Sequence, residues 1–175
     1  WASPQLIDDG ICGGMIGGVV SSQGNLILPV EDYVFDPERL IIDSYTSFDY
    51  GQNWQISNRI DLGPGDVYAH SGAIEPDVVE LQNGTIWMLI RTIWDEFYQA
   101  YSTDQGLTWI NIGPSGIASS NSPGYIHRLA SGRLILVWNQ GQDWYRDELT
   151  YAFSEDDGAT WINQTEFVGV DKSND

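Results

Sequence analysis

The octapeptide Ser102-Thr-Asp104-Gln-Gly106-Leu-Thr-Trp109 has two further copies in the chain, at residues 47–54 and 154–161. We call the three copies the first, second and third box, in chain order. Their aspartates lie 55 and 52 residues apart, a spacing that fits a four-stranded sheet with its turns, which is the unit of a β-propeller blade. The sequence therefore predicts a repeat protein that is built from blades.

The residues that the boxes share have structural roles. A Ser hydroxyl and an Asp carboxylate can accept backbone N–H groups of a tight turn, Gly permits a positive φ, and Trp anchors a hairpin in apolar packing. We therefore predict that each box is scaffold, with its Trp buried and its Asp bonded within the turn. The shared residues are Ser47, Asp49, Gly51 and Trp54, then Ser102, Asp104, Gly106 and Trp109, then Ser154, Asp156, Gly158 and Trp161.

A second repeated element, a turn dipeptide followed by an apolar strand, precedes each box. A shorter strand comes before that turn and a third strand joins the element to the box, so each repeat reads as one antiparallel blade. No segment keeps an apolar period of 3.6, so helix should be minor. We predict an all-β fold, a single domain over residues 1–175 with about three four-stranded blades at 11–60, 67–113 and 121–168.

The chain of 175 residues is strongly acidic, with 25 Asp plus Glu against 7 Lys plus Arg and a formal charge of −18. This charge argues against a nucleic-acid backbone or an anionic membrane as a partner. The one cysteine, Cys12, excludes an intramolecular disulfide and a Cys-based metal site. His70 and His127 have no third ligand at metal spacing, so we expect no metal and no other cofactor. The chain begins at Trp1 without an initiator Met, and we expect a mature or excised piece.

One long segment leads into the second box: Ile74-Glu75-Pro-Asp-Val-Val-Glu-Leu-Gln-Asn-Gly-Thr-Ile-Trp-Met-Leu-Ile-Arg91-Thr92. With the boxes and the strand elements, this segment makes the chain resemble the sialidase (neuraminidase) superfamily, the BNR or Asp-box repeat proteins, over nearly its whole length. The resemblance implies a six-bladed β-propeller, of which this chain would be about half, with the site at one end of a central channel. It also favours an extracellular or periplasmic location.

Active members of that superfamily are exo-glycosidases in which three arginines bind the substrate carboxylate, a glutamate activates a tyrosine nucleophile and an aspartate is the acid/base. By similarity, Glu75 matches the activating glutamate, Arg91 the second arginine and Arg146 the third. The first arginine, the acid/base aspartate and the nucleophile have no recognisable counterpart, so the resemblance implies an incomplete sialidase. Further candidate substrate contacts are His70, Tyr98 and Asn139.

Arg91 also stands out without the resemblance. It is one of only 7 cations and it ends an apolar strand, where its desolvation would be costly without an anionic partner. That partner is either a ligand carboxylate or a structural one such as Glu75. Arg146 lies among polar and acidic neighbours, so it is either a ligand contact or a solvated loop residue.

Three functions fit these residues. The first is a fragment or subunit of a sialidase-like glycoside hydrolase that acts on or binds an anionic saccharide through an arginine carboxylate clamp. The second is a non-catalytic glycan-binding propeller module. The third is a propeller-type polysaccharide lyase, in which His70 and Tyr98 would remove a proton beside a uronate carboxylate. All three predict a carboxylated sugar as the partner, and the open blade edges predict self-association or a longer chain.

Overall fold

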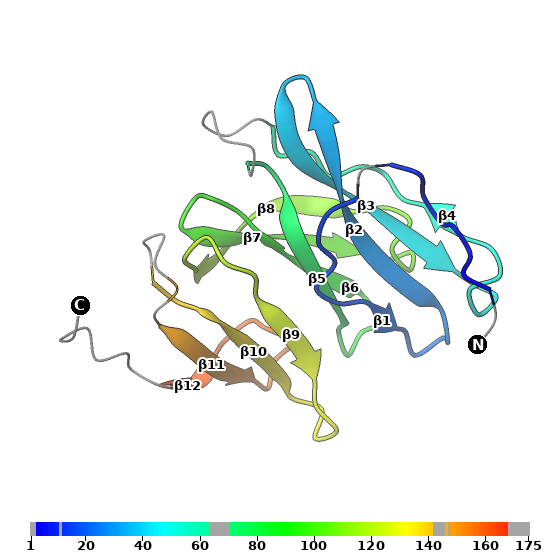
Figure 1. The fold of residues 1–175 in the computed structure, drawn as a ribbon. Helices are drawn as coiled ribbons and strands as arrows, with labels where there is room; N and C mark the ends of the chain where they lie inside the picture. The colour runs from blue at the N-terminus through cyan, green and yellow to red at the C-terminus, as the bar shows by residue number, and fades with distance from the viewer. Residues whose placement is uncertain (1–2, 11, 64–70, 142–145, 147, 168–175) are drawn as a thin grey trace.

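The computed structural model describes residues 3–10, 12–63, 71–141, 146 and 148–167. Within these residues the chain forms twelve strands and no helix (Figure 1). The strands make three four-stranded antiparallel sheets, each paired in chain order, so the predicted all-β fold of three blades is confirmed.

Each sheet is one blade. Blade 1 contains β1 (Val19–Val20), β2 (Leu26–Phe35), β3 (Glu38–Ser47) and β4 (Gln55–Ile56). Blade 2 contains β5 (Ile74–Glu80), β6 (Ile86–Arg91), β7 (Glu96–Ser102) and β8 (Ile110–Ala118). Blade 3 contains β9 (Tyr125–Arg128), β10 (Leu134–Asn139), β11 (Leu149–Ser154) and β12 (Ile162–Glu166).

The core consists of two apolar layers between the blades. One layer joins blades 1 and 2 and includes Ile27, Ile42 and Met88. The other joins blades 2 and 3 and includes Trp87 and Leu136. Because blade 2 is covered on both faces, every residue of β6 is buried, whereas burial alternates along the first part of β2.

The boxes have the predicted turn geometry. In the second box the Ser102 hydroxyl donates to Asp104 Oδ1 at 2.8 Å and accepts the Gly106 N–H at 2.8 Å. Asp104 Oδ1 also accepts the Thr108 N–H at 2.8 Å, and Gly106 has a φ of +84°. The same bonds recur in the first and third boxes. The box is therefore a locally bonded turn, as its residue types predict.

The expected burial of all three box tryptophans is wrong for two of them. Trp109 is 2% exposed and its Nε1 donates to Ser44 Oγ of blade 1 at 3.0 Å. Trp54 and Trp161 are only half-buried. For Trp54 the physical cause is that no described blade precedes blade 1 to cover its box. Trp161 does pack on Trp87 of the preceding blade, with ring centroids 6.5 Å apart, but that contact leaves part of its ring exposed.

In blade 2 the second box lies at one end of the sheet, and Glu75 and Arg91 lie at the other. Pairing places Ile74 opposite Arg91 at one end of blade 2, and Ile86 opposite Ser102 of the second box at the other. The first strands β1, β5 and β9 lie next to one another (Figure 1). They line a common cavity of about 600 Å³. The Glu75–Arg91 end is thus the end of blade 2 that lies away from the boxes.

Candidate functional site

Arg91 and Glu75 form the centre of the candidate site. Arg91, the last residue of β6, is 9% exposed, and its Nη1 lies 2.5 Å from Glu75 Oε2. Its Nε donates to Asn121 Oδ1 at 3.0 Å, from the connector that leads to β9. Nη2 has no hydrogen-bond partner among the described residues. The guanidinium is therefore held in place by two neighbours and still has donors to offer.

The backbone at Glu75 adopts an uncommon conformation. Glu75 has a φ of +40°, and the pairing of β5 with β6 shifts register between Ile74 and Asp77, as in a β-bulge. Its N–H donates to Glu31 Oε2 at 2.8 Å, across from blade 1. The bulge re-aims the Glu75 side chain toward Arg91, and the bond to Glu31 fixes the turn that makes this direction possible.

Glu31 is a second carboxylate beside the pair. It is 6% exposed, and its Oε1 accepts the Gly14 N–H at 3.2 Å. Burial raises the pKa of the Glu31 carboxyl, and the N–H bonds from Glu75 and Gly14 oppose that rise. The backbone at position 13 can come this close to Glu31 only as glycine, because a Cβ there would lie within 3 Å of the Glu31 carboxylate.

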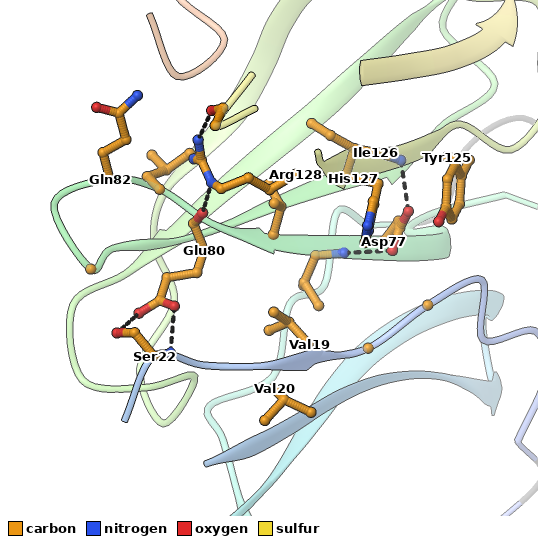
Figure 2. A pocket seen from close by; sticks show the side chains of 17 residues that line it. Val19, Val20, Ser22, Asp77, Glu80, Gln82, Tyr125, Ile126, His127 and Arg128 are labelled. Atoms are coloured by element: carbon orange, nitrogen blue, oxygen red, sulfur yellow. Dashed lines mark hydrogen bonds between the residues drawn. The ribbon is translucent and has the colours of Figure 1, made fainter. Parts of the chain in front are cut away.

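The cavity between the first strands is lined by Asp77 and by residues nearer the boxes, and not by Glu75 or Arg91. Figure 2 shows Asp77 pointing into it, with Oδ1 accepting the Val78 N–H at 2.9 Å and Oδ2 accepting the Ile126 N–H at 2.8 Å. Burial raises the pKa of Asp77 to about 6 against these two bonds. Tyr125 and His127 stack on each other with ring centroids 6.0 Å apart and line the same cavity.

The other predicted contacts do not join Glu75 and Arg91. Tyr98 is half-buried against the core, and its ring centroid lies 5.0 Å from that of Trp94. Arg146 is exposed and makes no ion pair with a described residue. Asn139 ends β10, where its carbonyl accepts the Ser120 N–H at 3.0 Å. His70 lies outside the described residues.

Three polar residues of this region were missed in the sequence. Asn121 lies in the polar connector Ser119-Ser-Asn-Ser-Pro123, which has no motif to mark it. Glu31 and Asp77 each carry a signal, since a carboxylate between apolar strand residues is costly to bury without donors. That signal indicates a buried acid, but it does not indicate which backbone N–H groups will meet it.

The described residues contain no group of three or more side chains placed to hold a metal ion. Among the same residues, no helix has the length and apolarity to cross a membrane.

Comparison with known proteins identifies the architecture. The family model described as the BNR repeat-like domain matches residues 1–168, whereas no curated protein sequence matches significantly. A protein of unknown function from Dyadobacter fermentans is 19% identical with a TM-score of 0.70, over 90% of this chain and 42% of that one. The NanB sialidase from Streptococcus pneumoniae is 20% identical with a TM-score of 0.66, over 88% of this chain and 25% of that one.

A third similar structure is the Trypanosoma rangeli sialidase in complex with 2,3-difluorosialic acid. It is 20% identical with a TM-score of 0.63, over 87% of this chain and 25% of that one. At such identities the likeness shows the fold alone, which is a sialidase-like propeller. The chain spans less than half the length of each of these three structures.

Proposed function

Because the chain belongs to the family of BNR repeat-like domains, we propose that it supplies part of a sialidase-like glycan site, in which Arg91 binds the carboxylate of an anionic sugar. One observation carries this proposal. Arg91 is nearly buried and fixed by Glu75 and Asn121, yet Nη2 is unused by the described residues.

The chemistry of the guanidinium favours a carboxylate ligand. Of its five N–H donors, Nε–H bonds Asn121 and one Nη1–H bonds Glu75, so Nη1 and Nη2 can still present a fork. A carboxylate matches that fork with two parallel bonds, which are strong in a partly desolvated site. A neutral hydroxyl can take only one of these donors well, so we expect sugars with a carboxylate to bind more tightly.

The proposed role of this chain is binding, with Glu75 as the catalytic contribution to a larger site. In the sialidase-like mechanism that the sequence suggests, Glu75 would activate a tyrosine nucleophile. No tyrosine hydroxyl among the described residues hydrogen-bonds Glu75. Hydrolysis would therefore need the tyrosine and the acid/base from further blades, supplied by a second copy or by a longer chain.

The choice of sialic acid as a probe rests on a relative. The Trypanosoma rangeli sialidase was solved with 2,3-difluorosialic acid, which supports sialic acid as a first ligand to test. Glucuronate is the second, because it has the carboxylate on a different sugar. The lyase alternative has less support, because Tyr98 packs against Trp94 and the core and makes no hydrogen bond to Arg91.

Calorimetric titration of wild type and Arg91→Lys with sialic acid and glucuronate tests the proposal. Lys keeps the charge but cannot form the fork, so we expect binding to weaken about 10- to 100-fold, the range for a hydrogen bond to a charged group. Arg39→Lys is the matched control, because the Arg39 guanidinium already bonds both carboxylate oxygens of Asp61. The affinity of this control variant for both sugars should equal that of wild type.

A double variant separates ligand binding from a purely structural ion pair. If Arg91 only neutralises Glu75, then Arg91→Met with Glu75→Gln should fold normally and keep any sugar affinity. If Arg91 binds the sugar carboxylate, the double variant should fold but lose its affinity for the sugar. Equal affinities of wild type and Arg91→Lys would refute the carboxylate role.

A further inference from the structure

Each box can contact the blade that comes before its own in the chain. The first such contact is between the second box, which belongs to blade 2, and blade 1. The second box lies against β2 and β3, so that a Cβ on Gly106 would be 2.8 Å from Ile27 Cγ2. Thr46 Oγ1 donates to the Gln105 carbonyl at 2.8 Å, and Asn25 Nδ2 donates to Gln105 Oε1 at 3.1 Å. The box of blade 2 is therefore docked onto the preceding blade by close packing and by polar bonds.

The same contact occurs between blades 2 and 3. A Cβ on Gly158 of the third box would be 2.7 Å from the Trp87 ring, and the Trp161 ring centroid lies 6.5 Å from that of Trp87. The Asp157 carboxylate accepts the Gln82 N–H at 2.8 Å. Two successive blades thus use one mode of docking, in which a box packs on the second and third strands of the blade before it.

Blade 3 has the acceptor surface of this contact, and no box among the described residues lies on it. Strand register pairs Ile27 with Thr46 in blade 1, Trp87 with Tyr101 in blade 2, and Ile135 with Phe153 in blade 3. Ile135 and Phe153 therefore occupy the acceptor positions. They line a pocket of about 470 Å³, together with Tyr151, Thr165, Glu166 and Phe167. We call these six residues the acceptor pocket.

Blade 1 has a box that no acceptor surface covers within the described part of the chain. Tyr50 of the first box has a φ of 59° and Gln105 of the second has 61°, so the two residues are structural equivalents. Tyr50 is 86% exposed, whereas Gln105 is 7% exposed beneath blade 1. The N-terminal segment touches this box through Gln5 Nε2, which donates to the Gln52 carbonyl at 3.3 Å. That contact leaves Tyr50 open to a partner.

We propose that the acceptor pocket of one chain receives the first box of a second copy of this chain. The donor and the acceptor lie on the outer blades, on opposite sides of blade 2 (Figure 1), so the contact is head to tail. The occupant is a second copy because its first box has the turn that docks twice within this chain, and because its exposed Tyr50 fits beside Arg133 and Phe153.

The docked geometry predicts one specific polar contact. Arg133 occupies the position in blade 3 that Asn25 has in blade 1, and Asn25 bonds Gln105 of the docked box. In the assembly Tyr50 takes the place of Gln105, so its ring would meet Arg133, which already lies 4.7 Å from the Phe153 ring centroid. A guanidinium between two aromatic rings is a favourable arrangement.

Sedimentation velocity over a concentration series tests the proposal with two single variants. Wild type should sediment as two copies of the 19.5 kDa chain. Ile135→Glu places a charge in the acceptor pocket, and Tyr50→Lys places a cation opposite Arg133. Each variant alone should dissociate at least about tenfold more readily, and an unchanged melting temperature would show that it remains folded.

Mixing the two variants distinguishes head-to-tail docking from other modes of dimerisation. Ile135→Glu keeps an intact box and Tyr50→Lys keeps an intact acceptor pocket, so an equimolar mixture should recover one interface and associate. Phe35→Ser is the matched control, because Phe35 is an apolar side chain that is 66% exposed but lies at the far end of β2 from the boxes. It should associate like wild type.

Three results would overturn the proposal. The first is a wild-type chain that stays monomeric up to its solubility limit, which would leave a further blade of a longer chain as the occupant. The second is association that survives in both single variants. The third is a mixture of the variants that remains as dissociated as its components. The outcome is independent of whether Arg91 binds a sugar.

Discussion

Asp77 shows how one buried carboxyl group affects the whole chain. It is 2% exposed on the first strand of blade 2, and it accepts N–H groups from its own strand and from Ile126 of blade 3. Those bonds tie two blades together, but burial raises its pKa from 3.8 to about 6. The residue therefore stabilises the fold more when it is protonated than when it is charged.

Stability should consequently depend on pH through Asp77. Between the unfolded and folded pKa values the native state keeps a proton that the unfolded chain has lost, so stability falls as pH rises from about 4 to about 6. The gap between the two values corresponds to about 3 kcal/mol. Between pH ~4 and pH ~7, the free energy of unfolding of Asp77→Asn should rise by about that much relative to that of wild type, as measured by urea unfolding.

A box aspartate provides the control. Bonds from Thr160 hold the pKa of Asp156 below its usual value, so this group is charged in both states above the acid range. Its stabilising effect is lost only as pH falls through the folded pKa. The difference between Asp156→Asn and wild type should therefore be constant from pH ~5 to pH ~7. A constant difference for Asp77→Asn as well would contradict the role given to burial.

At the level of the element, the box combines a local turn with a contact between blades. The turn is closed by bonds among residues two to four positions apart, such as Ser102 with Asp104 and Gly106. The contact between blades depends on glycine, because a side chain at that position would meet the preceding blade. The first and second boxes share the turn and differ in the contact, which allows the two roles to be measured separately.

Gly51→Ala and Gly106→Ala form a matched pair for this measurement. Both positions have a φ near +85°, so each alanine should cost about 1 kcal/mol or more in backbone strain. At Gly51 the new Cβ meets only ordinary contacts with Trp54 and Leu26, whereas at Gly106 it lies 2.8 Å from Ile27 Cγ2. Gly106→Ala should therefore cost about 1–3 kcal/mol more. Equal losses in thermal unfolding would mean that the docked box can shift freely.

For the whole molecule, charge opposes compactness. A formal charge of −18 on 175 residues produces self-repulsion that the folded state bears more than the expanded chain does. The ion pairs that the structure describes, such as Arg39 with Asp61 at 2.6 Å, offset only part of it. Stability and association of this chain should therefore be sensitive to ionic strength.

Added salt should raise the melting temperature near neutral pH. Going from about 0.01 M to about 0.15 M salt shortens the screening length from about 30 Å to about 8 Å, which is enough to weaken repulsion across one blade. The same titration near the isoelectric point of about 4.1 is the control, because there is little net charge to screen. A melting temperature that falls with salt near neutral pH would show that ion pairs outweigh the net charge.

The sequence by itself determined the features that depend on neighbouring residues. The box turns, the strands between them and the repeat spacing follow from short-range hydrogen bonding and from apolar alternation, so the all-β propeller fold could be predicted. The sequence also indicated that Arg91 needs an acidic partner, and the structure pairs it with Glu75. Both residues lie in one hairpin, where strand register is short-ranged as well.

Only the tertiary structure decided which residues from other segments meet that pair. Asn121 reaches Arg91 from the following connector and Glu31 reaches the Glu75 backbone from blade 1. It also decided that Trp109 is buried while Trp54 is only half-buried, although the two boxes have the same pattern. The physical reason is that these contacts depend on how one sheet is rotated against the next, and this rotation results from packing over a whole blade face.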